Sequence, residues 1–276
     1  MRTLLAVHAH PDDETITMGG TLARYSAQGV RTVVVTCTRG DLGWILDPSL
    51  VGQDVAGVRE RELEAAARTL GVSRVRQLGY ADSGLAGAPE NHRPGAFFAA
   101  PLPEACERLL DIIREERPQV LVAYDETGGY GHPDHIKSHQ VAVAAWAAAG
   151  QARPKKLYFV RFPLTWVRDF VRSLRDAGID APSTAPAGTD VGTDEQEMGV
   201  ADELAGTAVD VRKYVHVKRA ALACYASQLP PSHFLRRMPL ELAERLWAYE
   251  FYSLESDGSR RVTDDQREAD LFAGLD

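Results

Sequence analysis

Short apolar segments alternate along the chain with longer segments whose apolar residues recur at helical spacing. The apolar segments have the length and β-branched content of buried strands, and they lie at residues 3–7, 31–38, 75–80, 120–124 and 156–160. The longer segments predict helices, among them residues 58–70, 101–117, 135–149 and 166–174. Because strand and helix alternate repeatedly, the pattern predicts an α/β fold with a mostly parallel, Rossmann-like sheet and helices on both faces.

The composition changes after the last of these helices. Residues 177–199 are rich in Ala, Pro, Gly, Thr, Asp and Glu, which is typical of a flexible surface connection. A smaller C-terminal portion follows, with strands at 208–211 and 249–254 and helices at 214–228 and 240–246. We therefore expect one domain over residues 1–276. Its parts are a core of about 1–176, the connection, the C-terminal portion of about 200–256, and a charged tail, 257–276, that frays up to Leu271 and Phe272.

A polar run follows the first predicted strand and precedes a helical segment that ends at Gly29. It contains His10, Asp12 and Asp13, and Pro11 stiffens the turn between them. The run lies at the carboxyl end of a strand, the edge of an open α/β sheet where ligands bind. One imidazole and two carboxylates so close together are costly without a cation among them. The run therefore indicates either a divalent metal site or two Asp residues that only cap the following helix.

The same chemistry recurs after the fourth predicted strand, in the sequence YGHPDH at residues 130–135. Most of the chain's 8 histidines lie in or beside these two segments: His8, His10, His132, His135 and His139. Two such loops are hard to explain as two helix caps. We therefore expect both segments to form one site at the carboxyl ends of the strands.

Composition and charge narrow the class of protein. The 276 residues are 45% hydrophobic and 25% charged, which is enough for a full core. The net charge of −8 argues against nucleic acid or an anionic membrane as a partner. Three isolated cysteines argue against disulfides and favour a cytoplasmic location. We expect no signal peptide and no membrane-spanning helix, and a homo-oligomer is compatible with these features.

The residue types in the two segments suit metal-assisted hydrolysis of an amide. A catalytic zinc keeps three protein ligands, and His10, His135 and one of the two adjacent Asp residues would provide them. The other carboxylate is then placed to act as a general base on an activated water. His132 would stabilise an oxyanion or protonate a leaving amine, and Asp134 would fix the tautomer of His132.

The two segments also resemble the motifs of a known family. AHPDDE at residues 9–14 and GGYGHPDH at residues 128–135 resemble the paired motifs of the LmbE-like, PIG-L type deacetylases. Members of this family are zinc enzymes that remove acetyl groups from N-acetylglucosamine derivatives. The resemblance runs from Leu4 to about Gly150 and is strongest to the mycothiol-pathway branch, which holds GlcNAc-inositol deacetylases and S-conjugate amidases.

The resemblance implies roles at the metal and beside it. His10, Asp13 and His135 match the zinc ligands of the family. Asp12 matches its general base, which acts on the attacking water.

The resemblance also implies contacts with the substrate. His132 matches the residue at the oxyanion and leaving group, with Asp134 tuning it, and Tyr130 matches a residue that contacts the reacting acetyl group. Arg59, and Asp82 in the sequence ADSG, match positions that hold sugar hydroxyls.

The chain departs from the branch in the loop after the second predicted strand. That loop usually carries a glutamate that reaches the distal, inositol-like part of the substrate, whereas this chain has Trp44 there. An aromatic ring stacks on an apolar face and does not accept hydrogen bonds from hydroxyls as a carboxylate does. Trp44 is expected either to line the distal end of the site or to pack beneath its own loop. Either position weakens the case for an inositol aglycone.

The leading hypothesis is a zinc-dependent deacetylase of a small N-acetylglucosamine-containing glycoside. An amidase that cleaves a larger acyl group, such as a thiol S-conjugate, is its nearest rival, because the sequence pattern does not encode the width of an acyl pocket. Two His and one carboxylate equally suit ferrous iron, Fe2+, in a non-haem oxygenase, but an oxygenase needs no base beside the metal. A non-catalytic sugar-binding module would need neither Asp12 nor His132.

Overall fold

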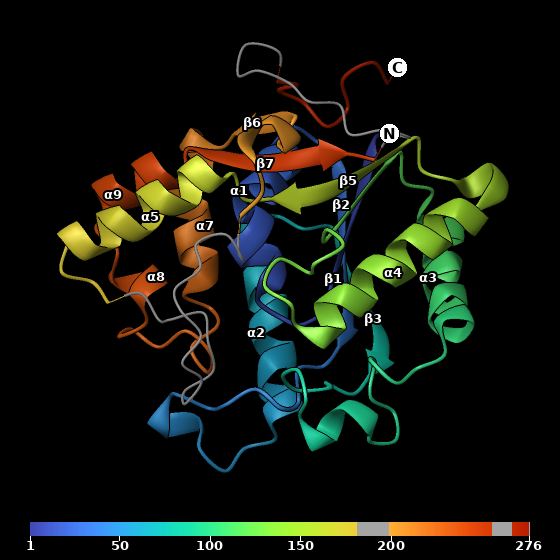
Figure 1. Ribbon diagram of the computed structural model, residues 1–276, viewed down its shortest axis with the longest axis horizontal. Helices are drawn as coiled ribbons and strands as arrows, with labels where there is room; N and C mark the ends of the chain where they lie inside the picture. Colours follow the sequence, from blue (N-terminus) through green and yellow to red (C-terminus); the bar gives the residue numbers. More distant parts are fainter. Residues whose placement is uncertain (181–198, 256–266, 276) are drawn as a thin grey trace.

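The computed structural model describes residues 1–180, 199–255 and 267–275, and within these ranges seven strands form one sheet in the order β3-β2-β1-β4-β5-β7-β6 (Figure 1). The strands are β1 (Thr3–His8), β2 (Arg31–Thr38), β3 (Arg74–Tyr80), β4 (Val120–Ala123), β5 (Lys156–Arg161), β6 (Thr207–Asp210) and β7 (Tyr249–Leu254). β1 to β5 pair in parallel, and β7 pairs antiparallel with both β5 and β6.

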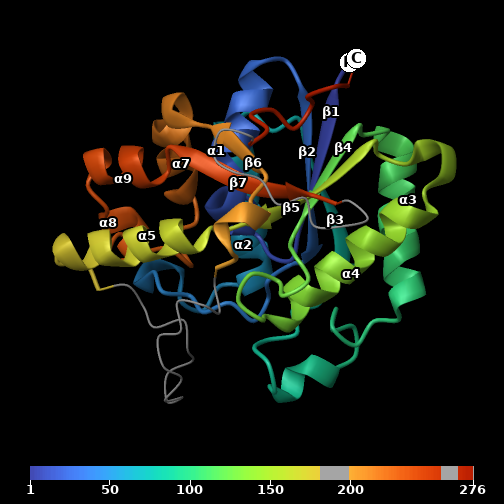
Figure 2. The ribbon, with the colours of Figure 1, turned by 45° about the horizontal axis from the view of Figure 1, so that its top comes forward.

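The helices lie on both faces of the sheet, and Figure 2 shows the two groups on either side. They are α1 (Asp13–Ala27), α2 (Val55–Leu70), α3 (Leu102–Glu116), α4 (Pro133–Ala148), α5 (Leu164–Asp176), α7 (Val215–Leu222), α8 (Phe234–Arg237) and α9 (Leu240–Leu246). Short 3₁₀ turns occur at Pro48–Leu50, Pro89–His92, Gly150–Ala152, Asp202–Leu204 and Arg212–Tyr214. No helix in the described ranges is both long and apolar enough to cross a membrane.

Successive residues of β1 enter two different cores. Leu4 packs with Leu22 of α1 and Leu63 of α2, whereas Leu5 packs in the core that α3 and α4 cover, with Leu109 and Val141. A parallel strand with helices on both faces is buried throughout, which explains why β1 contains the continuous apolar sequence Leu4–Val7. The predicted α/β class, with a mostly parallel sheet, is confirmed.

The helix predicted at 214–228 is wrong in its second half, because α7 ends at Leu222. Beyond it, the Tyr225 hydroxyl donates to Glu14 at 2.6 Å. The backbone N–H and the hydroxyl of Ser227 donate to Glu62 at 2.7 and 2.6 Å. These bonds give hydrogen-bond partners to the buried carboxylates of Glu14 and Glu62.

The part of the tail that the structure describes, residues 267–275, packs against the sheet and α1. Glu268 pairs with Lys156 at 2.7 Å, and the Leu271 N–H donates to the Tyr25 hydroxyl at 2.7 Å. Leu271 and Phe272 are buried. The expectation that the tail frays up to Leu271 is therefore wrong for residues 267–270. Most of the predicted connection at 177–199 lies outside the described residues.

α1 is kinked at Met18, whose φ of −143° and ψ of 24° are not helical. The backbone N–H groups of Gly20 and Thr21 after the kink donate to the Glu250 carboxylate of β7, at 3.0 and 2.7 Å. Glu250 also pairs with Lys218 at 2.7 Å, and both side chains are buried. The C-terminal portion thus holds the helix that follows the first His-Pro-Asp segment.

Gly20→Ala should lower the free energy of unfolding by about 1–3 kcal/mol, the usual effect of overpacking. The added Cβ would lie 2.7 Å from Cβ and Cγ2 of Val211, so one of the two backbones must shift. Gly19→Ala is the matched control and should cost less, because its Cβ would first meet the Lys218 side chain at 3.2 Å. Urea unfolding measures both values, and equal losses would contradict the prediction.

Candidate active site

The two His-Pro-Asp segments meet at the carboxyl ends of β1 and β4. The chain runs outward from β1 to β2 and β3 and then returns to β4 on the other side of β1. Ligands bind at such reversals of strand order in open α/β sheets. The ring centroid of His10, which follows β1, lies 4.7 Å from that of His132 and 5.3 Å from that of His135, at the start of α4.

His135 presents one ring nitrogen with a free lone pair. Its Nδ1 lies 3.0 Å from the carbonyl oxygen of Gly128, so Nδ1 carries the proton. Its Nε2 is buried and has no hydrogen-bond partner among the described residues. Gly128 is required at this turn, because its φ is 67° and a Cβ would lie 2.6 Å from the Cβ of His135.

Asp13 lies between two imidazoles. Its Oδ2 is 3.3 Å from His10 Nδ1 and 3.4 Å from His135 Nε2. Burial alone would raise the pKa of Asp13, but His135 and His10 hold it well below its usual range. An ionised carboxylate oxygen with two imidazole nitrogens around it is the donor set that suits zinc or ferrous iron.

The other nitrogen of His10 faces two more carboxylates. Nε2 lies 3.3 Å from Asp134 Oδ2 and 3.6 Å from Asp82 Oδ1, and the Ser83 N–H donates to the same Asp134 oxygen at 2.9 Å. From the sequence, the Asp134 carboxylate is expected to fix the tautomer of His132. In the structure that carboxylate contacts His10 instead, and the backbone N–H of Asp134 reaches His132 Nδ1 at 3.2 Å.

This backbone contact sets the tautomer of His132. Because Nδ1 accepts a hydrogen bond, the proton of the neutral ring is on Nε2. Burial lowers the pKa of His132 to about 3, with the neighbouring rings of His10 and His135 contributing. His132 is therefore a neutral imidazole that offers an N–H donor.

Asp12, directly before α1, has a strained backbone. Its φ is 113°, and a positive φ at a residue other than glycine costs on the order of 1–3 kcal/mol. Burial raises the pKa of Asp12 to about 7, although Arg59 opposes the shift. A carboxylate in this range can accept and return a proton at neutral pH.

Arg59 of α2 is buried beneath this loop. Its guanidinium donates to the carbonyl oxygens of Gly40 and Pro11, at 3.0 and 2.5 Å, and to Asp12 Oδ2 at 3.1 Å. The family resemblance implies that Arg59 holds sugar hydroxyls, whereas both of its η nitrogens contact the protein's own loops. Arg59 therefore fastens the loop after β1 to the loop after β2.

Two tyrosines flank His135. The Tyr124 ring stacks on it, with centroids 4.3 Å apart, and the Tyr124 hydroxyl accepts from the Ala9 N–H at 3.1 Å. The Tyr130 centroid is 4.9 Å from that of His135, and Tyr130 is half exposed. Sequence reasoning missed Tyr124, because a tyrosine at the end of an apolar strand looks like any other core residue.

Asp125 was also missed, and it shapes the loop that carries Gly128. Its Oδ1 accepts from the Thr127 N–H and hydroxyl at 3.0 and 2.7 Å and from the Gly129 N–H at 3.1 Å. Its Oδ2 pairs with Arg161 at 2.9 Å. Asp125 stands two residues before Thr127, which two glycines follow. This pattern is typical of a turn, and it could have identified Asp125 from the sequence.

Trp44 is 77% exposed, so it does not pack beneath its own loop. Its backbone carbonyl oxygen accepts from Gln228 Nε2 at 2.7 Å. The alternative expectation, that Trp44 lines the distal end of the site, stays a prediction.

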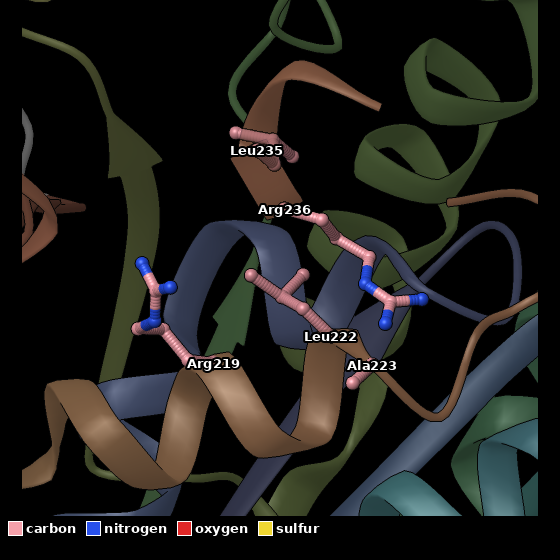
Figure 3. Close-up of a pocket in the computed structure, with 5 residues that line it drawn as sticks. All are labelled: Arg219, Leu222, Ala223, Leu235 and Arg236. Carbon is pink, nitrogen blue, oxygen red and sulfur yellow. The ribbon is translucent and has the colours of Figure 1, made fainter. Parts of the chain in front are cut away.

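A separate pocket of about 160 Å³ lies between α7 and α8 (Figure 3). It is lined by Arg219, Leu222, Ala223, Leu235 and Arg236. Both guanidinium groups already donate to backbone carbonyls, Arg219 to Met238 and Arg236 to Leu229. The pocket contains none of the residues that the two motifs brought together.

Comparisons with known proteins identify relatives over the full chain. The profile of the family described as PIG-L: GlcNAc-PI de-N-acetylase matches residues 5–146. A 1D-myo-inositol 2-acetamido-2-deoxy-alpha-D-glucopyranoside deacetylase from Acidothermus cellulolyticus is 42% identical over 288 residues, covering 100% of this chain and 96% of its own. A protein of the same name from Thermobifida fusca is 39% identical and covers 99% of each chain.

A solved structure shares the fold. N,N'-diacetylchitobiose deacetylase from Pyrococcus horikoshii superposes with a TM-score of 0.58 at 24% identity, and the match covers 92% of this chain and 84% of that one.

Arg59→Met should lower the free energy of unfolding by about 3–5 kcal/mol, because it leaves the buried Asp12 carboxylate without its cation. The matched control is Arg68→Met on the same helix. Arg68 pairs with Glu64 at 3.9 Å, and the two side chains are 71% and 60% exposed, so its loss should cost less than about 0.5 kcal/mol. Denaturant unfolding measures both, and similar losses would show that Arg59 does not hold the loops.

Proposed function

Because the chain belongs to the PIG-L family of deacetylases, as its two motifs predict, we propose that it hydrolyses the N-acetyl group of a small N-acetylglucosamine-containing glycoside. The observation that carries the proposal is that nitrogens of His10 and His135 both approach Oδ2 of Asp13, with Asp12 as the preceding residue. The inositol glycoside in the relatives' names is the first substrate to test. Three free cysteines support a cytoplasmic location.

We propose that a divalent metal, zinc or else ferrous iron, is held by His10 Nδ1, Asp13 and His135 Nε2. The buried, unpartnered Nε2 of His135 supports this fit. When bound, the metal would polarise the amide carbonyl and lower the pKa of a water. His10 Nε2–H then donates to Asp134, and a carboxylate behind a ligand histidine fixes the orientation of the ring.

Asp12 and His132 handle the proton and the developing charge. Asp12 takes the proton of the attacking water as the water oxygen bonds to the carbonyl carbon. His132 donates Nε2–H to the carbonyl oxygen as it becomes negative. Asp12 then returns the proton to the amide nitrogen as the C–N bond breaks, which gives acetate and a free amine.

Asp82, Tyr130 and Trp44 complete the proposed site on the substrate side. Burial alone would raise the pKa of Asp82, but His10 holds it below its usual range, so Asp82 is an ionised acceptor for hydroxyl groups. The half-exposed Tyr130 ring beside His135 is placed to meet the acetyl group. Trp44 offers an exposed aromatic face to the aglycone.

Chelation should abolish acetate release, and added zinc should restore it. Asp13→Ala should lose the metal, because it removes one of three protein ligands. Asp12→Asn should keep the metal but lose about 10²–10⁴-fold in kcat, the usual contribution of a general base. Metal analysis and an acetate-release assay on GlcNAc-inositol measure these effects, with longer N-acyl analogues as a test for an amidase. Full turnover after chelation, or equal metal loss in both variants, would contradict the proposed roles.

Trp44→Glu should shift preference toward a polyol aglycone such as inositol. A charge-assisted hydrogen bond is worth about 1.5–3 kcal/mol, so the ratio of kcat/KM for GlcNAc-inositol to kcat/KM for an aryl GlcNAc glycoside should rise by roughly tenfold or more. The acetyl end should be unaffected, because Asp12 and His132 are unchanged. An unaltered ratio would place Trp44 away from the substrate.

A further inference from the structure

We propose that Glu14 and Tyr225 form a brace that positions the general base Asp12, and that the segment 225–228 connects this brace to the loop that carries Trp44. The proposal deepens the proposed function, because it rests on Asp12 as the base. Glu14 and Tyr225 are positioning residues, since they act on the reaction through the backbone of Asp12.

Glu14 links the backbone of Asp12 to the C-terminal portion of the chain. Its Oε2 accepts from the Asp12 N–H at 3.1 Å, and its Oε1 accepts from the Tyr225 hydroxyl at 2.6 Å and from the Thr15 hydroxyl. Glu14 is 1% exposed and Tyr225 is fully buried. Water therefore cannot replace either bond without a rearrangement of the core.

The brace completes the fixation of Asp12. The carbonyl oxygen of Asp12 accepts from the N–H groups of Thr15 and Ile16, both at 3.0 Å, and its carboxylate accepts from Arg59. The N–H is the remaining backbone group, and Glu14 holds it. The N–H, the carbonyl oxygen and the carboxylate of Asp12 are thus all hydrogen-bonded. These bonds hold Asp12 at a positive φ, from which a residue without them would relax.

The segment 225–228 also reaches the distal side of the site. The Ser227 carbonyl oxygen accepts from the Leu46 N–H at 2.8 Å, and Gln228 Nε2 donates to the Trp44 carbonyl oxygen at 2.7 Å. Ser227 is itself held by Glu62 of α2. One short segment of the C-terminal portion therefore fixes both the general base and the loop proposed to meet the aglycone.

Tyr252 provides a matched control for Tyr225. Both tyrosines are fully buried, and both donate a hydroxyl hydrogen bond to the α1 region, since the Tyr252 hydroxyl donates to Thr21 Oγ1 at 2.8 Å. Thr21 lies beyond the kink, so this bond does not touch Asp12. Removal of either hydroxyl should lower the stability of the protein by a similar amount, but only Tyr225→Phe should disturb the position of Asp12.

The experiment compares Tyr225→Phe with Tyr252→Phe for kcat, KM, metal content, thermal midpoint and amide hydrogen exchange at Asp12. Tyr225→Phe should lower kcat by roughly tenfold, in line with the cost of misplaced catalytic groups, with KM within about twofold and the metal retained. Exchange at Asp12 should be faster. Tyr252→Phe should lower the thermal midpoint about as much as Tyr225→Phe does, but it should leave kcat and the Asp12 exchange rate unchanged.

A second pair of variants tests the brace by rescue. Glu14→Gln keeps an amide oxygen that can accept from the Asp12 N–H, whereas Glu14→Met removes the acceptor. Glu14→Gln should therefore retain more of kcat than Glu14→Met. Equal losses in this pair, or equal kcat losses in the two tyrosine variants, would overturn the brace.

The exchange measurement separates this proposal from the proposed function. A wild-type protein that releases no acetate would overturn the deacetylase function but would leave the exchange comparison intact. An Asp12 exchange rate that is the same in wild type and in Tyr225→Phe would overturn the brace whatever the activity.

Discussion

The parallel pairing of β1 with β4 is the constraint on which the site depends. Leu4, Leu5 and Ala6 lie opposite Val120, Leu121 and Val122 in register. Because the two strands are adjacent and point the same way, the segments that leave them emerge side by side at one edge. An antiparallel pair would send His10 and His135 to opposite edges of the sheet. The proximity of His10 and Asp13 to His135 follows from this pairing.

Burial of charge is the second constraint. Asp13, Asp82 and Asp134 are almost fully buried around His10, and buried carboxylates require partners. The imidazoles of His10 and His135 and the backbone N–H of Ser83 contact these carboxylates, and one nitrogen of His135 is without a hydrogen-bond partner among the described residues. The same crowding shifts the pKa values of the two adjacent carboxyl groups in opposite directions, up for Asp12 and down for Asp13.

The C-terminal portion supports the N-terminal motif from outside the region that the family profile matches, residues 5–146. Glu250 of β7 holds the N–H groups after the kink in α1, and Tyr225 reaches Glu14 within the motif itself. The two motifs thus lie in the N-terminal half of the chain, while Tyr225 and Glu250, which bond to Glu14 and to the backbone of α1, lie near its C-terminal end.

The sequence by itself determined the fold class, the family and the sheet edge at which the two His-Pro-Asp segments lie, because strand and helix periodicity and a turn after a strand are local properties. It did not determine that Arg59 faces Asp12, that the Asp134 carboxylate contacts His10, or that the chain leaves α7 at Leu222 to reach Glu14. These features depend on which distant segments the sheet brings together. A local pattern shows that a side chain is polar or apolar, but only tertiary packing decides which partner satisfies a buried polar group.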